Sequence, residues 1–466
     1  MTLTTYNFLA LSNRLPVERQ GSGDDVAWRS LPGGLVTAMK PVMQEQAGAW
    51  IGWAGVLDEE ISQFSMDRME IVPVQISSAE FEEFYEGFSN DALWPLYHDL
   101  IVQPRYESTW WEAYVRVNRR FADRAAELAS QGAQVWVHDY QLQLVPMMLR
   151  ESRPDLVIGF FDHIPFPPAS LFAQLPWREE ILRGLLGADV LGFQRTSDVQ
   201  HFREAVLDFL EIDADEADGS LKVDERSVVA EAFPISLDSA QFFEEVQNPA
   251  VAEQAERFRE QLGNPSTILL GLDRLDYTKG IPNRLEAYGS LLASGSISAR
   301  DVRLVQLASP SREGVAAYAE LSDEIARLVG TINGAHGDIG VTPVTYLRSS
   351  YPRIATLALL KAADVMLVTP LRDGMNLVAK EYVTAHEDSG VLVLSEFAGA
   401  ADEFEDAVIV NPHDSEHLAE EILRAITMPA SEQAERMTAL HEQVMEHDVH
   451  LWAQNFLRAL ELKAGR

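Results

Sequence analysis

Short apolar runs, each followed by a few polar residues, recur along the whole chain. Val157–Phe161 and Val190–Phe193 in the first half, and Ile268–Leu272 and Val365–Thr369 in the second half, are apolar at nearly every position. Runs of this kind form strands that are buried on both faces of a parallel sheet. The segments between them have apolar positions spaced as on one face of a helix. This alternation predicts an α/β fold.

The two groups of strands, one in each half of the chain, predict two doubly wound, Rossmann-like domains. Polar and charged residues follow the strands at their carboxyl ends, which is where parallel sheets bind ligands. We therefore expect the ligand-binding edges of the two domains to face a central cleft. We place the first domain at residues 1–236 and the second at residues 237–450.

The bulk properties agree with this organisation. A chain of 466 residues exceeds one ordinary domain core, and 47% hydrophobic with 23% charged residues is typical of a globular protein. No apolar run is long enough to span a bilayer. The N-terminus lacks the basic lead and the cleavage site of a signal peptide, so we expect a cytoplasmic protein. With no cysteine, disulfides and thiolate chemistry are excluded.

The formal net charge is −35, from 72 acidic and 37 basic residues. A surface of this sign repels nucleic acids and anionic membranes, so neither is an expected partner. If the ligands are anionic, the few arginines and lysines near them must overcome an unfavourable field. Basic residues that follow strands are therefore the strongest candidates for binding residues.

The segment Leu371–Glu381, LRDGMNLVAKE, carries the strongest functional signal. It follows an apolar strand and leads into a predicted helix over Asn376–His386, whose N-terminus can present backbone N–H groups to a phosphate. Glu381 suits a ribose diol, and Asp373 can accept hydrogen bonds from sugar hydroxyls. A helix capped by Asp373 is the structural alternative, but it leaves the charges of Arg372 and Lys380 unexplained.

A second basic motif is Gly271–Gly280, GLDRLDYTKG. Arg274 and Lys279 follow a buried strand and lie on either side of a turn. The planar fork of an arginine and the compact charge of a lysine can together neutralise a leaving diphosphate. Surface ion pairs with Asp273 and Asp276 explain the same two residues equally well.

Two strand ends in the first half offer acid–base groups. Asp139 in WVHDYQL can bind or deprotonate a hydroxyl, and His163 in GFFDHIPFPP can donate to an oxygen near a reaction centre. A lone histidine is more often structural, however. Gly33 and Gly34 in LPGGL permit close approach of a ligand to the backbone, although a plain turn is the simpler explanation. No residues have metal-ligand spacing, so no metal site is predicted.

Taken together, these motifs resemble those of the trehalose-6-phosphate synthases. SNRLP, PGG, FSN-x3-WP, HDYQL, HIPFP, RLDYTKG, SREG, TPLRDGMNLVAKEY and VLVLSEFAGAA occur in the order and spacing of that family, between Tyr6 and Leu457. The resemblance implies a retaining glycosyltransferase of the GT-B type, with a C-terminal helix, residues 451–466, that packs back on the N-terminal domain. It also implies transfer of glucose from a nucleotide-glucose donor, usually UDP-glucose, to glucose 6-phosphate, giving α,α-trehalose 6-phosphate. No cofactor is expected, a homo-oligomer is compatible with the family, and a separate phosphatase is expected downstream in the pathway.

The resemblance further implies a role for each matching residue. Arg274 and Lys279 would bind the donor diphosphate, and Glu381 the ribose. Asp373 and His163 would bind the transferred glucose. The other implied donor residues are Gly33, Gly34, Tyr351, Leu377, Val378, Ala379 and Lys380, with Tyr351 beside the nucleobase. The implied acceptor residues are Arg14, Trp53, Tyr85, Trp94, Asp139 and Arg312, with Arg14 and Arg312 near the phosphate.

Four positions depart from the family pattern. Gln141 stands where histidine is frequent, and Asp162 stands where an apolar residue often precedes the motif histidine. Thr331 replaces a common arginine, and His413 replaces a common tyrosine. None of them is a motif residue with an implied role, so we expect them to change specificity or loop packing before they change the reaction.

Other functions remain compatible with parts of this pattern. The nearest alternative is a glucosylglycerol-phosphate synthase, or a pseudo-glycosyltransferase that joins cyclitols, because such acceptors also carry a phosphate. A regulatory sensor with an inactive site is disfavoured by the intact Arg274, Lys279 and Asp373. A periplasmic sugar-binding protein is disfavoured by the missing signal peptide. The preference for UDP, ADP or GDP in the donor stays open.

Retention of configuration suggests a carboxylate nucleophile, as in retaining glycosidases, but the chain offers no convincing one. We therefore expect front-face displacement, in which the departing phosphate oxygen accepts the proton of the attacking hydroxyl. Arg274, Lys279 and the N-terminus of the helix after Asn376 would stabilise the growing negative charge. This mechanism requires no metal ion.

Overall fold

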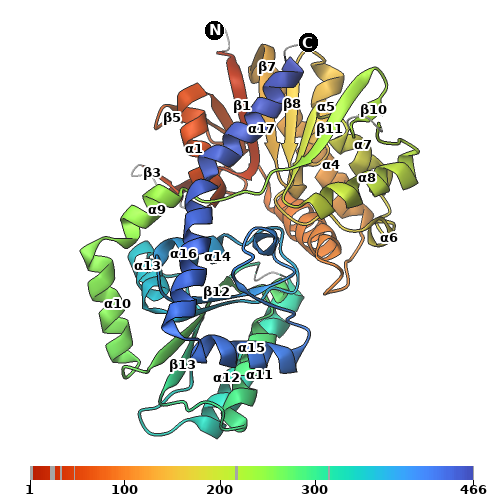
Figure 1. The fold of residues 1–466 in the computed structure, drawn as a ribbon. Helices are drawn as coiled ribbons and strands as arrows, with labels where there is room; N and C mark the ends of the chain where they lie inside the picture. The colour runs from red at the N-terminus through yellow and green to blue at the C-terminus, as the bar shows by residue number, and fades with distance from the viewer. Residues whose placement is uncertain are drawn as a thin grey trace. The chain divides into compact units, whose positions relative to one another are not determined.

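The computed structural model describes residues 4–20, 27–31, 34–46, 48–215, 219–312 and 315–464, and the chain divides into two compact units. Unit 1 comprises Met1–Ile235 with His450–Arg466, and unit 2 comprises Ser236–Val449. Each unit has its own, largely parallel sheet with accompanying helices (Figure 1). The prediction of an α/β chain with two Rossmann-like domains is therefore confirmed. Within the described ranges, no helix is both long enough and apolar enough to cross a membrane.

The main sheet of unit 1 has nine strands in the order β10-β11-β9-β8-β7-β1-β4-β6-β5. In chain order these are β1 (Tyr6–Arg14), β4 (Ala49–Trp53), β5 (Phe64–Met66), β6 (Met69–Pro73), β7 (Ala129–His138), β8 (Val157–Phe161), β9 (Val190–Phe193), β10 (Leu221–Val223) and β11 (Arg226–Ala232). All pairs are parallel except the two at the edges, β10 with β11 and β5 with β6. The inner strands β8 and β9 are buried at nearly every residue, which explains their continuous apolar sequence. A separate antiparallel pair is formed by β2 (Val17–Gln20) and β3 (Ala27–Ser30).

Helices connect the strands of unit 1. They are α1 (Gly34–Gln46), α2 (Ser78–Glu80), the π-helix η1 (Phe81–Leu93), α3 (Trp94–Tyr97), α4 (Ser108–Leu128), the 3-10 turn η2 (Tyr140–Leu142), α5 (Val145–Ser152), α6 (Ala169–Phe172), α7 (Arg178–Leu185) and α8 (Thr196–Leu210). The amphipathic pattern of α4 accounts for its orientation. It buries one face, which includes Tyr114, Val117 and Phe121 at helical spacing, and leaves its arginines on the other.

The C-terminal helix α17 (Val449–Ala464) packs on the sheet of unit 1, where Figure 1 shows it beside β7 and β8. The ring of Phe456 stacks on Trp136 of β7 with centroids 4.4 Å apart, and Trp452 lies edge-on to Phe161 of β8 at 5.1 Å. The C-terminal helix therefore returns to the N-terminal domain, as predicted. A separate helix, α16 (Ala430–Glu446), precedes it.

The sheet of unit 2 has six strands in the order β14-β13-β12-β15-β16-β17, and every pair is parallel. The strands are β12 (Thr267–Arg274), β13 (Val302–Ser309), β14 (Val344–Leu347), β15 (Val365–Val368), β16 (Val391–Ser395) and β17 (Val408–Val410). The helices are α9 (Ser239–Val246), α10 (Pro249–Gln261), α11 (Ile281–Ala293), α12 (Ala316–His336), α13 (Arg353–Ala362), α14 (Leu377–Ala385) and α15 (Ser415–Thr427), together with α16 and the 3-10 turns η3 (Tyr277–Lys279) and η4 (Gly399–Asp402).

In each main sheet, the early strands are added on one side of the first strand and the later strands on its other side, so the strand order reverses once. In unit 1 the reversal lies between β1 and β7, and in unit 2 it lies between β12 and β15. The loops on either side of such a point leave in opposite directions and open a crevice at the carboxyl ends of the strands, where α/β sheets bind ligands. The ends of these four strands are therefore the places to look for a site.

Candidate functional site

In unit 2, Arg274 and Lys279 lie beside the reversal point. Arg274 is the last residue of β12, so the strand runs two residues beyond the predicted Leu272, and Lys279 ends the turn η3 that follows. Asp276 caps this turn by accepting a hydrogen bond from the backbone N–H of Thr278 at 3.1 Å. Glycine is required next, at Gly280, because φ is +60° and a Cβ would lie 2.2 Å from the backbone oxygen of Thr369, the residue after β15. These constraints fix the backbone that carries Lys279.

Lys279 and Asp373, which the sequence suggests as separate binding residues, are in direct contact. The Nζ of Lys279 lies 2.6 Å from Oδ2 of Asp373, and Asn376 donates from Nδ2 to the same oxygen at 3.0 Å. The alternative in which Asp373 caps the helix is wrong, because the N-cap of α14 is Asn376, whose Oδ1 accepts from the N–H of Ala379. Asp373 instead directs its carboxylate to the lysine of the neighbouring turn.

The first turn of α14 contains Leu377, Val378 and Ala379, three of the implied donor residues. The N–H groups of Leu377 and Val378 have no acceptor within the helix, as is general for a helix N-terminus, and the positive end of the helix dipole lies there. The side chain of Lys380 points elsewhere: it is buried, and its Nζ donates to both carboxylate oxygens of Glu403 at 2.8 and 3.0 Å. This ion pair is one explanation for the charge of Lys380 within the chain, and its implied role in donor binding stays a prediction.

Glu381 is held by an arginine that the sequence analysis did not single out. Nη1 of Arg353 lies 3.6 Å from Oε1 of Glu381, while Nε of Arg353 donates to Glu245 of α9 at 2.8 Å. Burial raises the pKa of Glu381, and the guanidinium of Arg353 opposes that rise. Tyr351, the implied nucleobase neighbour, is half-buried two residues before Arg353, between β14 and α13.

Arg312 follows β13, and its side chain contacts Asp276, which caps the turn that carries Lys279. Its Nη1 donates to Oδ2 of Asp276 at 3.1 Å and to the hydroxyl of Tyr318 at 2.7 Å. Burial by itself would raise the pKa of Asp276, but Arg312, Arg274 and Lys279 lower it to about 2. Asp276 is therefore an ionised carboxylate that partly neutralises three cations.

In unit 1, Arg14 ends β1 at the reversal point and lies against Trp53, the last residue of β4. Its guanidinium carbon lies 4.9 Å from the Trp53 ring centroid, and its buried Nη1 has no hydrogen-bond partner among the described residues. Gly55 makes room for this group, because φ is +81° and a Cβ there would lie 1.3 Å from Nη1 of Arg14. A fixed, buried guanidinium nitrogen with an unused donor is suited to an anionic ligand.

The aromatic residues implied for the acceptor lie on or beside the π-helix η1. Tyr85 is 6.4 Å from Trp53 between ring centroids, and Phe81 lies between them, 5.4 Å from Trp53 and 5.2 Å from Tyr85. Trp94 follows η1, is buried, and lies 5.7 Å from the ring of Tyr140. A π-helix is rare, and short π-helical turns occur frequently at functional sites. The structure therefore brings Tyr85 and Trp53 together with Arg14.

Asp139 directly follows β7, at the other side of the reversal in unit 1. It has φ of +76°, an uncommon conformation for a residue with a side chain, and its Oδ1 accepts from the N–H of Tyr140 at 3.0 Å. Strain at a strand end is compatible with a functional position. Gln141, one of the departures from the family pattern, is buried in the next turn, whereas Thr331 and His413 are exposed.

His163 and Asp162 follow β8 and have different surroundings. Nε2 of His163 lies 3.2 Å from Nδ1 of the buried His138, and burial lowers the pKa of His163 to about 3, so its imidazole is neutral near pH 7. Asp162 is fully buried, and its Oδ2 has no hydrogen-bond partner in the described part of the chain. Burial, followed by the charges of Asp139 and Asp198, raises the pKa of Asp162 well above its usual range.

Of the two glycines in LPGGL, Gly34 is the first residue of α1, while Gly33 lies outside the described residues. Gly34 therefore lies at a helix N-terminus. Its predicted contact with the donor sugar stays a prediction.

Three side chains that contact and support the site residues could not be recognised from the sequence. They are Tyr318, Arg353 and Arg284, the last fully buried and bonded to Asp273 at 2.7 Å and to the carbonyl oxygen of Lys279 at 2.7 Å. Each lies within a helix, where a tyrosine or arginine is an ordinary residue. Only the contacts across the sheet edge reveal their roles.

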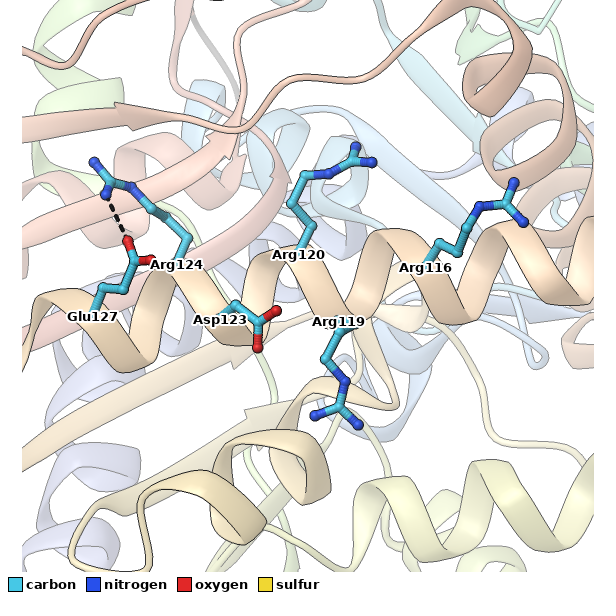
Figure 2. Close-up of a pocket in the computed structure, with 6 residues that line it drawn as sticks. All are labelled: Arg116, Arg119, Arg120, Asp123, Arg124 and Glu127. Atoms are coloured by element: carbon cyan, nitrogen blue, oxygen red, sulfur yellow. Dashed lines mark hydrogen bonds and ion pairs between the residues drawn. The ribbon is translucent and has the colours of Figure 1, made fainter.

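One further group of cations lies on α4 of unit 1. Figure 2 shows Arg116, Arg119, Arg120 and Arg124 along this helix, where they line a shallow pocket with Asp123 and Glu127. Each arginine has a carboxylate neighbour: Glu83, Glu151, Glu80 and Glu127, respectively. These charges are compensated within the chain, so they do not form a second anion site. Among the described residues, no cluster of three or more His, Asp or Glu side chains is arranged to hold a metal ion.

The chain is similar to proteins of one known family. The model of glycosyltransferase family 20 matches residues 6–462. A trehalose-6-phosphate synthase of Mycobacterium avium (strain 104) is 50% identical over 469 residues, covering 97% of this chain and 95% of its own. The UDP-forming α,α-trehalose-phosphate synthase of Burkholderia xenovorans in complex with glucose-6-phosphate has a TM-score of 0.89 at 32% identity, covering 98% of this chain and 100% of its own. A trehalose-6-phosphate structure from E. coli bound with UDP-2-fluoro glucose has a TM-score of 0.88 at 32% identity, covering 97% and 98%.

Proposed function

Because the chain belongs to glycosyltransferase family 20, we propose that it is a UDP-forming trehalose-6-phosphate synthase, which transfers glucose from UDP-glucose to glucose 6-phosphate. The observation that carries this proposal is the 50% identity, over nearly the whole chain, to a trehalose-6-phosphate synthase. The ligands of two structural relatives, glucose-6-phosphate and UDP-2-fluoro glucose, support the choice of acceptor and donor. The product is α,α-trehalose 6-phosphate.

We assign donor binding to the reversal point of unit 2. Arg274 and Lys279 bind the diphosphate together with the N-terminus of α14, and Glu381 binds the ribose. The ion pair between Lys279 and Asp373 supports this assignment, because it places a cation for phosphate next to a carboxylate for sugar hydroxyls. Tyr351 lies beside the nucleobase in this assignment.

We assign acceptor binding to Arg14, Trp53, Tyr85, Trp94 and Asp139 in unit 1 and to Arg312 in unit 2. The buried, unpaired Nη1 of Arg14 supports a phosphate contact in unit 1. The aromatic group around Trp53 offers apolar faces on which a hexose ring can lie.

The mechanism we propose is front-face displacement. The leaving phosphate oxygen accepts the proton of the attacking hydroxyl, and Arg274, Lys279 and the helix dipole stabilise the charge that develops on the diphosphate. The neutral imidazole of His163 contributes a hydrogen bond to the transferred glucose rather than a charge, because its pKa of about 3 keeps it unprotonated near pH 7.

The test is an assay of the purified full chain with UDP-, ADP- and GDP-glucose as donors. Glucose 6-phosphate and glycerol 3-phosphate are compared as acceptors, with unphosphorylated glucose as control, and both nucleotide release and the disaccharide product are measured. We expect UDP release and trehalose 6-phosphate only with glucose 6-phosphate. Absence of nucleotide release with every donor would overturn the proposal, and turnover only with glycerol 3-phosphate would indicate a glucosylglycerol-phosphate synthase.

A further inference from the structure

Three cations at the strand ends of unit 2 share one buried carboxylate. Asp276 is fully buried between β12 and η3, and its charge interacts with Arg312, Arg274 and Lys279. Its two oxygens have different roles. Oδ1 accepts from the N–H of Thr278 and fixes the turn that carries Lys279, whereas Oδ2 accepts from Arg312 at 3.1 Å. One side chain therefore connects the turn of the donor site to the arginine that follows β13.

Tyr318 completes this contact. Its hydroxyl accepts from Nη1 of Arg312 at 2.7 Å and donates to Oδ2 of Asp276 at 3.3 Å. The ring is buried, and it packs on Tyr277 of η3 with centroids 5.2 Å apart. Tyr318 lies in the first turn of α12, where side chains point back toward the helix N-terminus and hence toward Arg312.

Arg312 needs such support because its backbone does not determine where its side chain points. It lies outside any helix or strand and has φ of +47°, an uncommon conformation for a residue with a side chain. Its side chain is nonetheless only 7% exposed. A long arginine side chain loses considerable rotamer freedom when it is held in one place, so the two contacts must offset that cost.

We propose that Tyr318 is a positioning residue which, with Asp276, holds the guanidinium of Arg312 in the orientation that binds the acceptor phosphate. This inference rests on the proposed function and adds to it a residue with no direct contact to either substrate. A guanidinium recognises phosphate through a planar fork of donors, so its orientation affects affinity as much as its charge does.

The test is Tyr318→Phe, which removes one oxygen and keeps the buried ring. We expect the KM for glucose 6-phosphate to rise roughly tenfold, as for a lost hydrogen bond to a charged group. The KM for UDP-glucose and kcat should change by less than about twofold, because Asp276 still caps the donor turn. The matched control is Tyr288→Phe, another buried tyrosine of unit 2, whose hydroxyl donates to the backbone oxygens of Val302 and Pro343. This control should leave all three parameters unchanged.

A double-mutant cycle separates positioning from general packing. If Tyr318 acts through Arg312, then adding Tyr318→Phe to Arg312→Ala should cause no further loss of acceptor affinity. Asp276→Asn provides a second variant, because it keeps the oxygen that caps the turn and removes the charge that attracts Arg312. We expect its KM for glucose 6-phosphate to rise at least as much as that of Tyr318→Phe.

An unchanged KM for glucose 6-phosphate in Tyr318→Phe would overturn the inference, as would additive losses in the double mutant. An equal rise in both Michaelis constants, or the same rise in Tyr288→Phe, would also overturn it. If the wild-type chain formed no product from UDP-glucose and glucose 6-phosphate, the proposed function would fall, and this inference with it. An active wild-type enzyme with an unaffected Tyr318→Phe variant would overturn the inference alone.

Discussion

Lys279 and Asp373 form a direct ion pair, with Nζ 2.6 Å from Oδ2 and side chains that are only 12% and 15% exposed. They lie in the segments that follow β12 and β15, the two strands that flank the reversal in unit 2. Without ligand, the carboxylate neutralises the lysine inside a chain of formal net charge −35. The pair keeps either charge from being buried without a partner of opposite sign.

The first prediction concerns Asp373→Asn, which keeps the shape of this side chain but removes its charge. UDP should bind at least as tightly as to the wild type, because Lys279 then offers its full charge to the diphosphate. Turnover with UDP-glucose should fall about 10²-fold, since the sugar loses a charged hydrogen-bond acceptor. Titration calorimetry with UDP and steady-state kinetics measure the two effects. A parallel loss of UDP affinity and turnover would contradict the assignment of Asp373 to the sugar.

The second prediction concerns Arg274→Ala. If Arg274 stabilises the charge on the leaving diphosphate, kcat should fall by roughly 10²–10³, as for loss of one preorganised donor. The control is Arg300→Ala in the same unit, whose side chain is 68% exposed and pairs with Asp338. An exposed pair contributes little, so this variant should retain wild-type kinetics. Near-normal turnover of Arg274→Ala would exclude the proposed role.

The third prediction concerns Gly55→Ala in unit 1. The added methyl group would occupy the place of the Arg14 guanidinium and would also disfavour φ of +81°. We expect Arg14 to leave the face of Trp53 and the KM for glucose 6-phosphate to rise about tenfold or more. Gly132→Ala is the control for backbone strain alone, because φ there is +71° and nothing lies within 4 Å of an added Cβ. Equal kinetic effects of both substitutions would refute the steric explanation.

The fourth prediction concerns the pH dependence of stability caused by Asp162. Burial raises the pKa of this carboxyl in the folded chain, whereas the unfolded chain releases the proton near pH 4. As the pH rises above that value, only the unfolded state loses the proton, so stability falls until the folded pKa is reached. Asp162→Asn cannot ionise, and its stability relative to wild type should increase with pH by up to about 1.4 kcal/mol per unit within that window.

Urea unfolding of the Asp162→Asn and wild-type chains between pH 5 and pH 9 measures this difference. Asp208→Asn, an exposed position on α8 of the same unit, is the control for the substitution itself. A stability difference that stays constant over the range would show that Asp162 is ionised in the folded state.

Much of the fold was predictable because parallel strands buried on both faces must be apolar throughout. β8 and β9 begin and end at the predicted residues, whereas β12 begins one residue earlier, at Thr267, and ends two residues later, because Asp273 and Arg274 continue the strand although they are charged. The hydropathy pattern shows where a strand leaves the apolar core. It does not show where the backbone hydrogen bonds to the neighbouring strand end.

For the site, the sequence by itself determined which residues follow strands, and hence that Arg14, Asp139, Lys279 and Asp373 lie at the carboxyl edges of parallel sheets. Strand order, and with it the reversal points that bring Lys279 to Asp373, depends on pairing between segments far apart in the chain. The contact between Lys380 and Glu403 is also visible only in the tertiary structure. The same is true of the contacts that Arg312 makes with Tyr318 and Asp276. The sequence does not show which group a charged side chain contacts. Only the folded structure decides whether that group is another side chain or whether the charge stays available to a ligand.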